Sequence, residues 1–183
     1  MTISFQNLEE FPGWHNSTNH QTYFESLLTK QAAKYVLEIG SGANPILTPR
    51  YVHDKGISYV TSDVDSKELE KADPVFKRIV LDISSGVLDH GLTGKFDCIL
   101  STMVGEHISY GAQYHKNIFK MLKPGGISAH CFSTLGAMPF VANRILPEPI
   151  ADFLLQMYAP RDSHKSGKFK AYYSWSRGPA KAW

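Results

Sequence analysis

Two glycines and a carboxylate in the N-terminal half of the chain have a spacing that suits contact with a nucleoside. Gly40 and Gly42 follow the apolar run "YVLEI" directly, and glycine there lets a ligand approach the backbone without meeting a Cβ atom. Asp63 ends the next apolar run, 21 residues after Gly42. In dinucleotide-binding folds, an acidic residue at about this sequence spacing hydrogen-bonds the ribose hydroxyls. The third glycine of a dinucleotide-binding loop is missing, because Asn44 stands in its place. An ordinary strand-to-helix turn is the alternative for the loop, and Asp65 could cap the helix that follows.

Two further apolar runs end in polar residues that could bind a ligand or do chemistry. Asp82 follows "RIVL" and could accept a hydrogen bond from the exocyclic amine of a base, with a turn-forming role as the alternative. "FDCILSTMVGEHI" passes from apolar residues into Ser101, Thr102, Glu106 and His107. Imidazole is well suited to proton transfer near neutral pH, so His107 is the candidate catalytic residue, with a structural histidine as the alternative.

Alternating strands and helices would bring these residues together. The sequence predicts strands in the apolar runs 34–40, 57–63, 77–83, 95–104 and 127–135. It predicts helices at 22–33, 66–72 and 110–122, the last stopped by Pro124-Gly125-Gly126, and a loop containing Pro49 and Gly56 between the first two strands. Strands with such connections form a parallel sheet with helices on both faces, which binds ligands beyond the carboxyl ends of its strands.

Composition and charge limit the class of protein. The 183 residues suit one domain, and a formal charge of +2 argues against binding to nucleic acid or to an anionic membrane. No apolar run reaches the roughly 18 residues of a membrane span, and the N-terminal segment has no features of a signal peptide. Cys98 and Cys131 both lie in apolar runs, as expected of reduced cysteines in a cytoplasmic protein. The eight histidines show no metal-ligand spacing, so no metal is expected.

Five stretches of this chain resemble the successive motifs of class I S-adenosylmethionine-dependent methyltransferases. They are "VLEIGSGANP", "YVTSDVDSKEL", "VLDIS", "KFDCILSTMVGEHI" and "MLKPGGISAHCFS", and they cover about residues 20 to 135. The "EH" of "VGEHI" followed by "LKPGG" is similar to the branch that acts on small molecules. The resemblance implies a Rossmann-like, doubly wound, mainly parallel α/β sheet, S-adenosyl-L-methionine as cofactor and a small-molecule acceptor. Because this cofactor carries no phosphate, the loop does not require a third glycine, which accounts for Asn44.

The resemblance also implies which residues bind the cofactor, at the ends of the first four strands. They are Glu38, Gly40, Ser41, Gly42, Asp63, Val64, Asp82, Ile83, Ser101, Thr102 and Met103. Glu38 would position the methionine end, and the glycine loop would approach the ligand through its backbone. Asp63 would bind the ribose hydroxyls, with Val64 packed on the adenine. Asp82 and Ile83 would contact the edge and the face of the adenine.

The acceptor side would be formed by the end of the fourth strand. By the resemblance, residues 101–103 line the floor beneath the transferred methyl group, and His107 lies where family members line the acceptor. A general base is needed only when the acceptor must lose a proton early, as a hydroxyl does. His107 is the candidate for that role, with Glu106 and His130 as alternatives.

The chain is expected to be a single methyltransferase domain over residues 1–183. Residues 1–33 would form an N-terminal helical segment, 34–135 the cofactor-binding core, and 136–183 a lid or acceptor segment. Because the chain ends soon after "KFKAYYSWS", the last antiparallel hairpin of the family is expected to be missing or replaced by that stretch. A truncated C-terminus would leave the fifth strand with an open edge, which favours self-association.

Two other functions stay open at this stage. An inactive or truncated fragment could bind S-adenosylmethionine without catalysis. An NAD-dependent oxidoreductase is the more distant alternative, because a pyrophosphate at the start of a helix requires more glycine than this loop contains.

Overall fold

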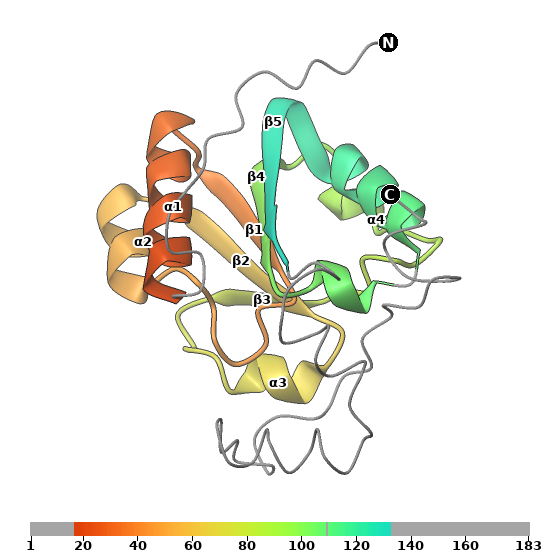
Figure 1. Cartoon of the computed structure of the whole chain (residues 1–183), viewed down its shortest axis with the longest axis horizontal. Coiled ribbons are helices and arrows are strands. Elements are labelled where there is room, and N and C mark those ends of the chain that lie inside the picture. Colours follow the sequence, from red (N-terminus) through yellow and green to blue (C-terminus); the bar gives the residue numbers. More distant parts are fainter. Residues whose placement is uncertain (1–16, 109, 133–183) are drawn as a thin grey trace, which may run out of the picture.

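A computed structural model describes residues 17–108 and 110–132 of the chain (Figure 1). Its sheet has five parallel strands in the order β3-β2-β1-β4-β5. The strands are β1 (Tyr35–Ile39), β2 (Ser58–Asp63), β3 (Lys77–Val80), β4 (Phe96–Thr102) and β5 (Leu122–Cys131). The chain runs outward from β1 to β3 and then crosses to the other side of β1, so the strand order reverses between β1 and β4. The predicted doubly wound parallel sheet is therefore confirmed, while the expected loss of a final hairpin concerns residues outside the described ranges.

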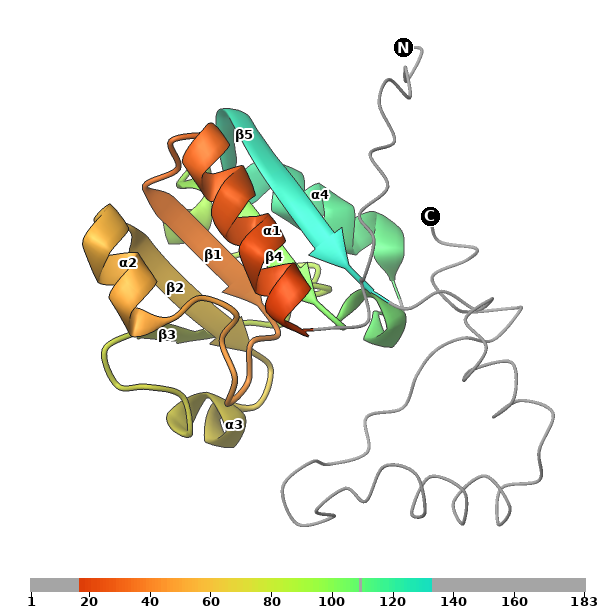
Figure 2. The ribbon, with the colours of Figure 1, turned by 60° about the vertical axis from the view of Figure 1, so that its left-hand side comes forward.

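Helices lie on both faces of the sheet, as predicted. They are α1 (Ser17–Lys30), α2 (Pro49–Lys55), α3 (Ser66–Glu70) and α4 (Gly111–Met121), with two 3-10 helices, η1 (His90–Leu92) and η2 (Gly105–His107). Helices α1 and α2 cover one face and α4 covers the other (Figure 1, Figure 2). The short α3 lies beside the carboxyl end of β2, which it follows in the chain (Figure 2).

The central strands β1 and β4 are buried on both faces because each face packs against its own apolar cluster. On the side of α1, Phe24 and Leu28 pack in one cluster with Val36 of β1. On the side of α4, Ile118 packs in a second cluster with Leu37 of β1. Successive residues of a strand point to opposite faces, so neighbouring residues of one apolar run enter different clusters.

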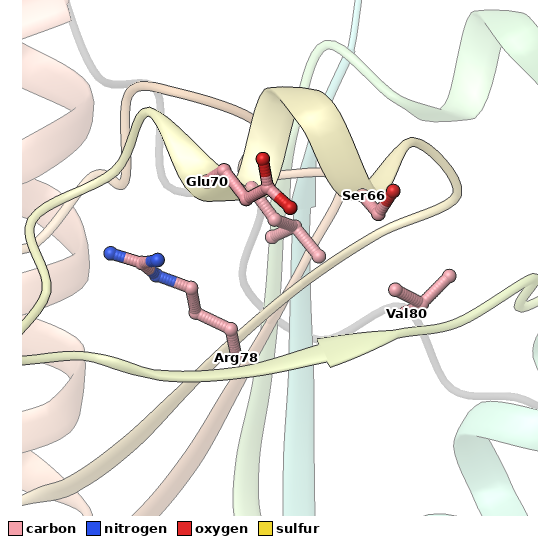
Figure 3. Close-up of a pocket in the computed structure, with 5 residues that line it drawn as sticks. Ser66, Glu70, Arg78 and Val80 are labelled. Atoms are coloured by element: carbon pink, nitrogen blue, oxygen red, sulfur yellow. The ribbon is translucent and has the colours of Figure 1, made fainter.

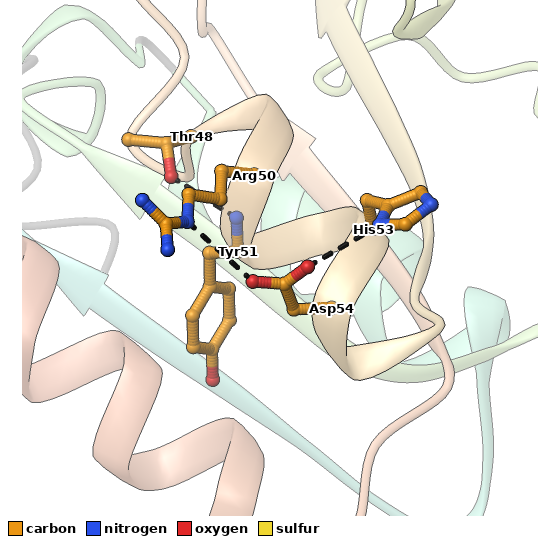
Figure 4. Close-up of polar contacts among 5 residues, drawn as sticks. All are labelled: Thr48, Arg50, Tyr51, His53 and Asp54. Carbon is orange, nitrogen blue, oxygen red and sulfur yellow. Dashed lines mark hydrogen bonds and ion pairs between the residues drawn. The ribbon is translucent and has the colours of Figure 1, made fainter.

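The prediction of a loop between the first two strands is wrong, because α2 forms there. The Thr48 side chain accepts a hydrogen bond from the backbone N–H of Tyr51 at 3.2 Å and so caps the helix (Figure 4). Pro49 occupies the first helical position, and Gly56 ends the helix in the left-handed conformation (φ 60°). A threonine followed by proline, with a glycine directly after the last helical residue, is the signal of a short helix that the apolar pattern could not give.

Strand β5 begins earlier than predicted and contains a bulge. The Pro-Gly-Gly sequence, which was expected to stop the preceding helix, lies within β5. Phe96 of β4 pairs with Leu122, but the next pair is Cys98 with Ile127, so β5 has three more residues than β4 between these two pairs. Gly125 adopts φ 80° within this bulge, a conformation that glycine tolerates without strain.

The Asp97 carboxylate joins the amino ends of three strands, opposite the carboxyl edge of the sheet. Its Oδ2 accepts the backbone N–H groups of Lys34 and Tyr35 at 2.9 and 2.8 Å, and its Oδ1 accepts Lys123 Nζ at 2.6 Å. Burial alone would raise the pKa of this carboxyl, but the three hydrogen bonds outweigh it and hold the pKa below its ordinary value of 3.8. The ionised carboxylate is therefore the form that the fold stabilises.

Replacing Asp97 with alanine is expected to lower the free energy of unfolding by about 2–3 kcal/mol, since charge-assisted hydrogen bonds to two strands are lost. The measurement is urea unfolding near pH 7. Because the folded pKa is lowered, this stabilisation is present above the unfolded pKa and disappears as the pH falls through the lower folded value.

Asp54→Ala is the matched control for Asp97→Ala. Asp54 makes an ion pair with Arg50 at 3.7 Å and a hydrogen bond with His53 Nδ1 at 3.2 Å, all on the exposed surface of α2 (Figure 4). Exposed pairs contribute little, so this variant should lose less than about 1 kcal/mol. Equal losses in the two variants would contradict the role given to Asp97.

Both cysteines are free thiols, as predicted. Cys98 is completely buried in β4, and burial, with a smaller contribution from the charge of Asp97, raises the pKa of its thiol to about 12. Cys131, at the end of β5, is half-buried. Neither thiol is poised to react in the folded protein.

Candidate functional site

The site begins at the carboxyl ends of β1 and β4, where the strand order reverses. After Ile39 the chain enters a turn with two glycines in the left-handed conformation, Gly40 (φ 67°) and Gly42 (φ 50°). Ser41 between them donates its backbone N–H to the Ser62 carbonyl at 3.0 Å. This hydrogen bond ties the turn to the end of β2 and fixes its position at the switch point of the sheet.

The two glycines of the turn are required for different reasons. A Cβ atom on Gly40 would lie 2.4 Å from Val104 Cγ2, so a side chain of the protein itself fills that space. A Cβ atom on Gly42 would lie 3.5 Å from Asp63 Oδ2. Packing therefore accounts for Gly40 without a ligand, whereas Gly42 lies directly opposite the carboxylate predicted to bind ribose.

Asp63 uses one carboxylate oxygen in a turn, and its other oxygen lies near Gly42. Its Oδ1 accepts the backbone N–H of Asp65 at 3.0 Å, which shapes the turn after β2. Asp65 in turn accepts the backbone N–H of Lys67 at 2.9 Å and caps α3, so the predicted cap is confirmed. Val64 between the two carboxylates is 58% exposed, which leaves its side chain available to a flat ligand group. The turn uses Oδ1, and Oδ2 faces Gly42.

Glu38 is a buried carboxyl beneath the glycine turn. Its Oε2 accepts the Tyr59 hydroxyl and also the backbone N–H of Ile46 at 3.0 Å. Burial raises the pKa of Glu38 to about 7, although both hydrogen bonds act to lower it. The carboxyl thus anchors the chain beyond the turn to β1 and β2, and it changes protonation in the neutral pH range.

Glu38→Gln is expected to remove a pH dependence of stability. Because the folded pKa is raised, the group favours the folded state most below the unfolded value of 4.5, and this advantage is lost as the pH rises to about 7. The stability of the variant relative to wild type should therefore increase over that range, by up to about 3 kcal/mol, and level off above it. Urea unfolding of both proteins from about pH 5 to pH 8 measures the difference. A constant difference would show that Glu38 is ionised throughout in the folded protein.

The segment after β3 carries the two residues predicted to contact adenine. Asp82 is exposed, and its Oδ1 accepts both the backbone N–H and the hydroxyl of Ser84, at 2.9 and 2.6 Å. The turn-forming alternative for Asp82 is thus observed, and only one of its oxygens takes part in it. Ile83 is 3% exposed and packs in the cluster beneath α4.

The end of β4 combines a buried polar cluster with an unusual backbone. Ser101 Oγ lies 2.8 Å from His130 Nδ1 and 3.2 Å from the Tyr114 hydroxyl, and those two groups are 3.0 Å apart. Thr102 Oγ1 is buried and has no hydrogen-bond partner among the described residues. Met103 adopts φ 56°, a conformation that is strained for a residue with a side chain, and it is 45% exposed.

The histidines near this edge differ in their surroundings. Burial, helped by the charge of His115, lowers the pKa of His130 to about 4, so its ring is neutral near pH 7. His130 Nε2 is buried and lacks a hydrogen-bond partner within residues 17–108 and 110–132. His107 ends η2, is half-buried and donates its backbone N–H to the Val104 carbonyl at 2.8 Å. Glu106 beside it is only 3% exposed.

A small hollow of about 160 Å³ lies at the outer edge of the sheet, between α3 and β3 (Figure 3). It is lined by Ser66, Leu69, Glu70, Arg78 and Val80. None of the residues predicted to bind the cofactor lines this hollow. It is therefore separate from the predicted site.

The predicted cofactor residues lie on strand ends and connections that share one edge of the sheet. No sequence pattern predicts the contact of Val104 with Gly40, the hydrogen bond of Tyr59 with Glu38, or the partners of Ser101. These contacts join residues from different elements, so no local pattern records them. Between residues 17 and 132, omitting 109, there is no group of three His, Cys, Asp or Glu side chains that could hold a metal ion.

Comparison with known proteins gives a family match and several similar structures. A protein-family model described as a methyltransferase domain matches residues 15–168. Among solved structures, an S-adenosylmethionine-dependent methyltransferase from Clostridium acetobutylicum ATCC 824 is 15% identical, with a TM-score of 0.56 over 69% of this chain and 54% of that one. The CMeT domain of the citrinin polyketide synthase is 20% identical, with a TM-score of 0.52 over 62% of this chain and 34% of that one.

A third similar structure contains a ligand. The trans-methyltransferase CalH in complex with SAH is 20% identical, with a TM-score of 0.50 over 60% of this chain and 35% of that one. The chain thus spans between about a third and about half of the length of these three proteins. Likeness at this level of identity shows a shared fold. No curated protein matches the sequence, and none of the helices described is long and apolar enough to cross a membrane.

Proposed function

The chain belongs to the methyltransferase-domain family, and on this basis we propose that it binds S-adenosylmethionine and transfers the methyl group to a small-molecule acceptor. Its sheet has the fold of class I S-adenosylmethionine-dependent methyltransferases. The cofactor would lie along the carboxyl edge of the sheet, over β1, β2 and β4. We expect this to occur in the cytoplasm.

The observation that carries the proposal is the pairing of the glycine turn with Asp63. Gly42 leaves Asp63 Oδ2 directed at the turn, while Oδ1 is held by the turn after β2. The hydroxyl of Ser41 is buried and has no partner among the described residues, so a polar ligand group would satisfy it. A carboxylate, an unpaired hydroxyl and a tight glycine turn at the switch point suit a ribose with a polar tail.

Different residues would contact different parts of the cofactor. The Asp63 carboxylate would accept hydrogen bonds from the ribose hydroxyls, and the exposed Val64 would pack against the adenine. Ile83 would contact the adenine from the side of α4. Glu38, anchored beneath the turn, would hold the backbone that faces the methionine end.

S-adenosylmethionine, when bound, supplies a methyl group already activated on a sulfonium, so the protein has mainly to align the acceptor. Residues 101–103 would form the floor at the transfer position, and the left-handed backbone at Met103 sets the direction of its side chain. His107 would take the proton of a hydroxyl acceptor. His130 is less suited to that role, because its Nδ1 is engaged by Ser101 and its lowered pKa makes it a weak base.

Titration calorimetry of the full chain with S-adenosylhomocysteine tests the binding, with NAD as the comparison ligand. We expect saturable one-to-one binding of S-adenosylhomocysteine and no binding of NAD. Absence of S-adenosylhomocysteine binding by the folded chain would reject the proposal, and NAD binding would favour an oxidoreductase. Transfer is tested separately with tritiated S-adenosylmethionine and a panel of small hydroxyl and amine acceptors.

The same assay tests the role of His107 by comparing the His107→Ala variant with wild type. His107→Ala should lose turnover with hydroxyl acceptors and retain S-adenosylhomocysteine binding. Unchanged turnover would exclude His107 as the base. Binding without transfer to any acceptor in the panel would favour a module that holds the cofactor without catalysis.

The outer edge of β5 could pair with a strand of another copy of the chain. Within the described ranges β5 pairs with β4 alone. We propose that this edge supports self-association of the chain, by strand pairing. Sedimentation of the full chain would show a concentration-dependent dimer if this is so, and a monomer at all concentrations would reject it.

A further inference from the structure

Asn117 is a polar residue on the buried face of α4. Its side chain is 1% exposed, and its helix neighbours Tyr114, Ile118 and Met121 are buried apolar or aromatic residues. An amide placed there loses its contacts with water, which is unfavourable unless every polar atom finds a partner. The contacts of Asn117 therefore show what the residue does in this fold.

All the hydrogen-bonding groups of the Asn117 amide are used. Its Nδ2 donates to the Ile83 carbonyl at 2.8 Å and to the Ser85 carbonyl at 2.9 Å. Its Oδ1 accepts Gln113 Nε2 at 2.9 Å from one turn earlier in α4. The two N–H groups of one amide thus hold two carbonyls of the segment that follows β3.

The segment that Asn117 holds has an ordered shape of its own. Asp82 accepts the backbone N–H and the hydroxyl of Ser84 through Oδ1, and its carbonyl accepts the backbone N–H of Ser85 at 3.1 Å. These bonds are local, so they set the curvature of the segment and not its distance from the sheet. The contacts from Asn117, together with the packing of Ile83 beneath α4, set that distance.

We propose that Asn117 is a positioning residue for the adenine side of the cofactor site. It acts through the backbone of residues 83 and 85 and does not touch the ligand. The inference rests on the proposed function, because Asp82 and Ile83 are the residues expected to contact adenine. It adds that α4, which also carries Tyr114 of the polar cluster at Ser101, sets the adenine side and the transfer side of the site together.

Calorimetry of the full chain with two ligands distinguishes the contribution of the adenosine half of the site from that of the methionine half. S-adenosylhomocysteine occupies both halves, whereas 5′-methylthioadenosine carries the adenosine without the amino acid. Asn117→Ala removes the side-chain partner of two carbonyls, one buried and one partly buried, and frees the segment to move. We expect affinity for both ligands to fall by the same factor, roughly 10-fold.

Ile118→Val is the matched control. Ile118 is adjacent to Asn117 and 2% exposed, so its truncation also lowers the unfolding midpoint, but it leaves the two carbonyls paired. This variant should bind both ligands as wild type does. Equal losses of affinity in the two variants would mean that general destabilisation is responsible and would overturn the inference.

The outcomes distinguish this inference from the proposed function. Failure of wild type to bind S-adenosylhomocysteine would reject the proposed function. Binding by wild type, with folded Asn117→Ala binding both ligands equally well, would reject the positioning role alone. If Asn117→Ala does not fold, Asn117→Ser, which can pair only one carbonyl, decides by the same comparison. A loss confined to S-adenosylhomocysteine would also overturn the inference, since it would place the effect at the methionine end.

Discussion

Asp63→Asn is expected to weaken S-adenosylhomocysteine binding by roughly 50-fold, because a charged acceptor of ribose hydroxyls becomes a neutral amide. The substitution is chosen to spare the fold. An asparagine oxygen can accept the backbone N–H of Asp65 as Asp63 Oδ1 does, so the turn after β2 is retained. Calorimetry gives the affinity, and circular dichroism shows that the variant is folded.

Asp65→Ala is the control for this substitution, because the two carboxylates are neighbours with different tasks. Asp65 caps α3 through the backbone N–H of Lys67, so its loss should lower the free energy of unfolding by about 1 kcal/mol. Its effect on affinity should be less than about 3-fold. If Asp63→Asn bound as tightly as wild type, Asp63 would be a turn residue only, and the ribose would have to be bound elsewhere.

Gly40→Ala is expected to destabilise the protein by about 3 kcal/mol or more, from overpacking and from left-handed strain together. The new Cβ would lie 2.4 Å from Val104 Cγ2, at a backbone φ of 67°. Valine is stiff about its first side-chain bond, so Val104 cannot move aside without cost. Urea unfolding measures the loss.

Removal of the obstructing methyl groups separates the two causes. In the double variant Gly40→Ala with Val104→Ala, the nearest atom of residue 104 is Cβ at 3.5 Å, an ordinary contact. The double variant should therefore be more stable than Gly40→Ala alone, and the remaining deficit reflects strain and the lost methyl groups of Val104. Gly42→Ala isolates strain, because its Cβ would meet nothing closer than 3.5 Å, and it should cost about 1 kcal/mol. Equal losses for Gly40→Ala and Gly42→Ala would contradict the packing at Val104.

The strands were predictable from the sequence because the central sheet is buried on both faces. Val36 to Ile39 and Cys98 to Leu100 are almost completely buried, so their runs are apolar apart from Glu38 and are bounded by turn residues. Helix α2 could not be found in this way. It has seven residues and none of them is buried, so its only signals are Thr48 and Pro49 at its start and Gly56 at its end.

The sequence was enough to predict which edge of the sheet carries the candidate site, but not which side chains contact one another there. Parallel strands place their carboxyl ends together, which brings Gly42 and Asp63 to one place by topology alone. Ser101 meets Tyr114, Glu38 meets Tyr59, and Asn117 meets the Ile83 carbonyl. These partners lie 13 to 34 residues away in the chain. Which side chain meets which depends on the register of the strands and the rotation of α4, and neither leaves a periodic trace in the sequence.

The reaction of the buried Cys98 thiol with a thiol reagent would report how often the sheet opens around β4. A thiol reagent can reach this side chain only after the central strand separates from its neighbours, whereas the half-buried Cys131 is labelled earlier. Labelling of the chain would accordingly proceed in two phases. The rate of the slow phase depends on how often the sheet opens to expose Cys98. A ligand that binds only the closed form slows that phase by the factor 1 + [L]/Kd. The affinity of the site can thus be read from a labelling rate before any acceptor is known.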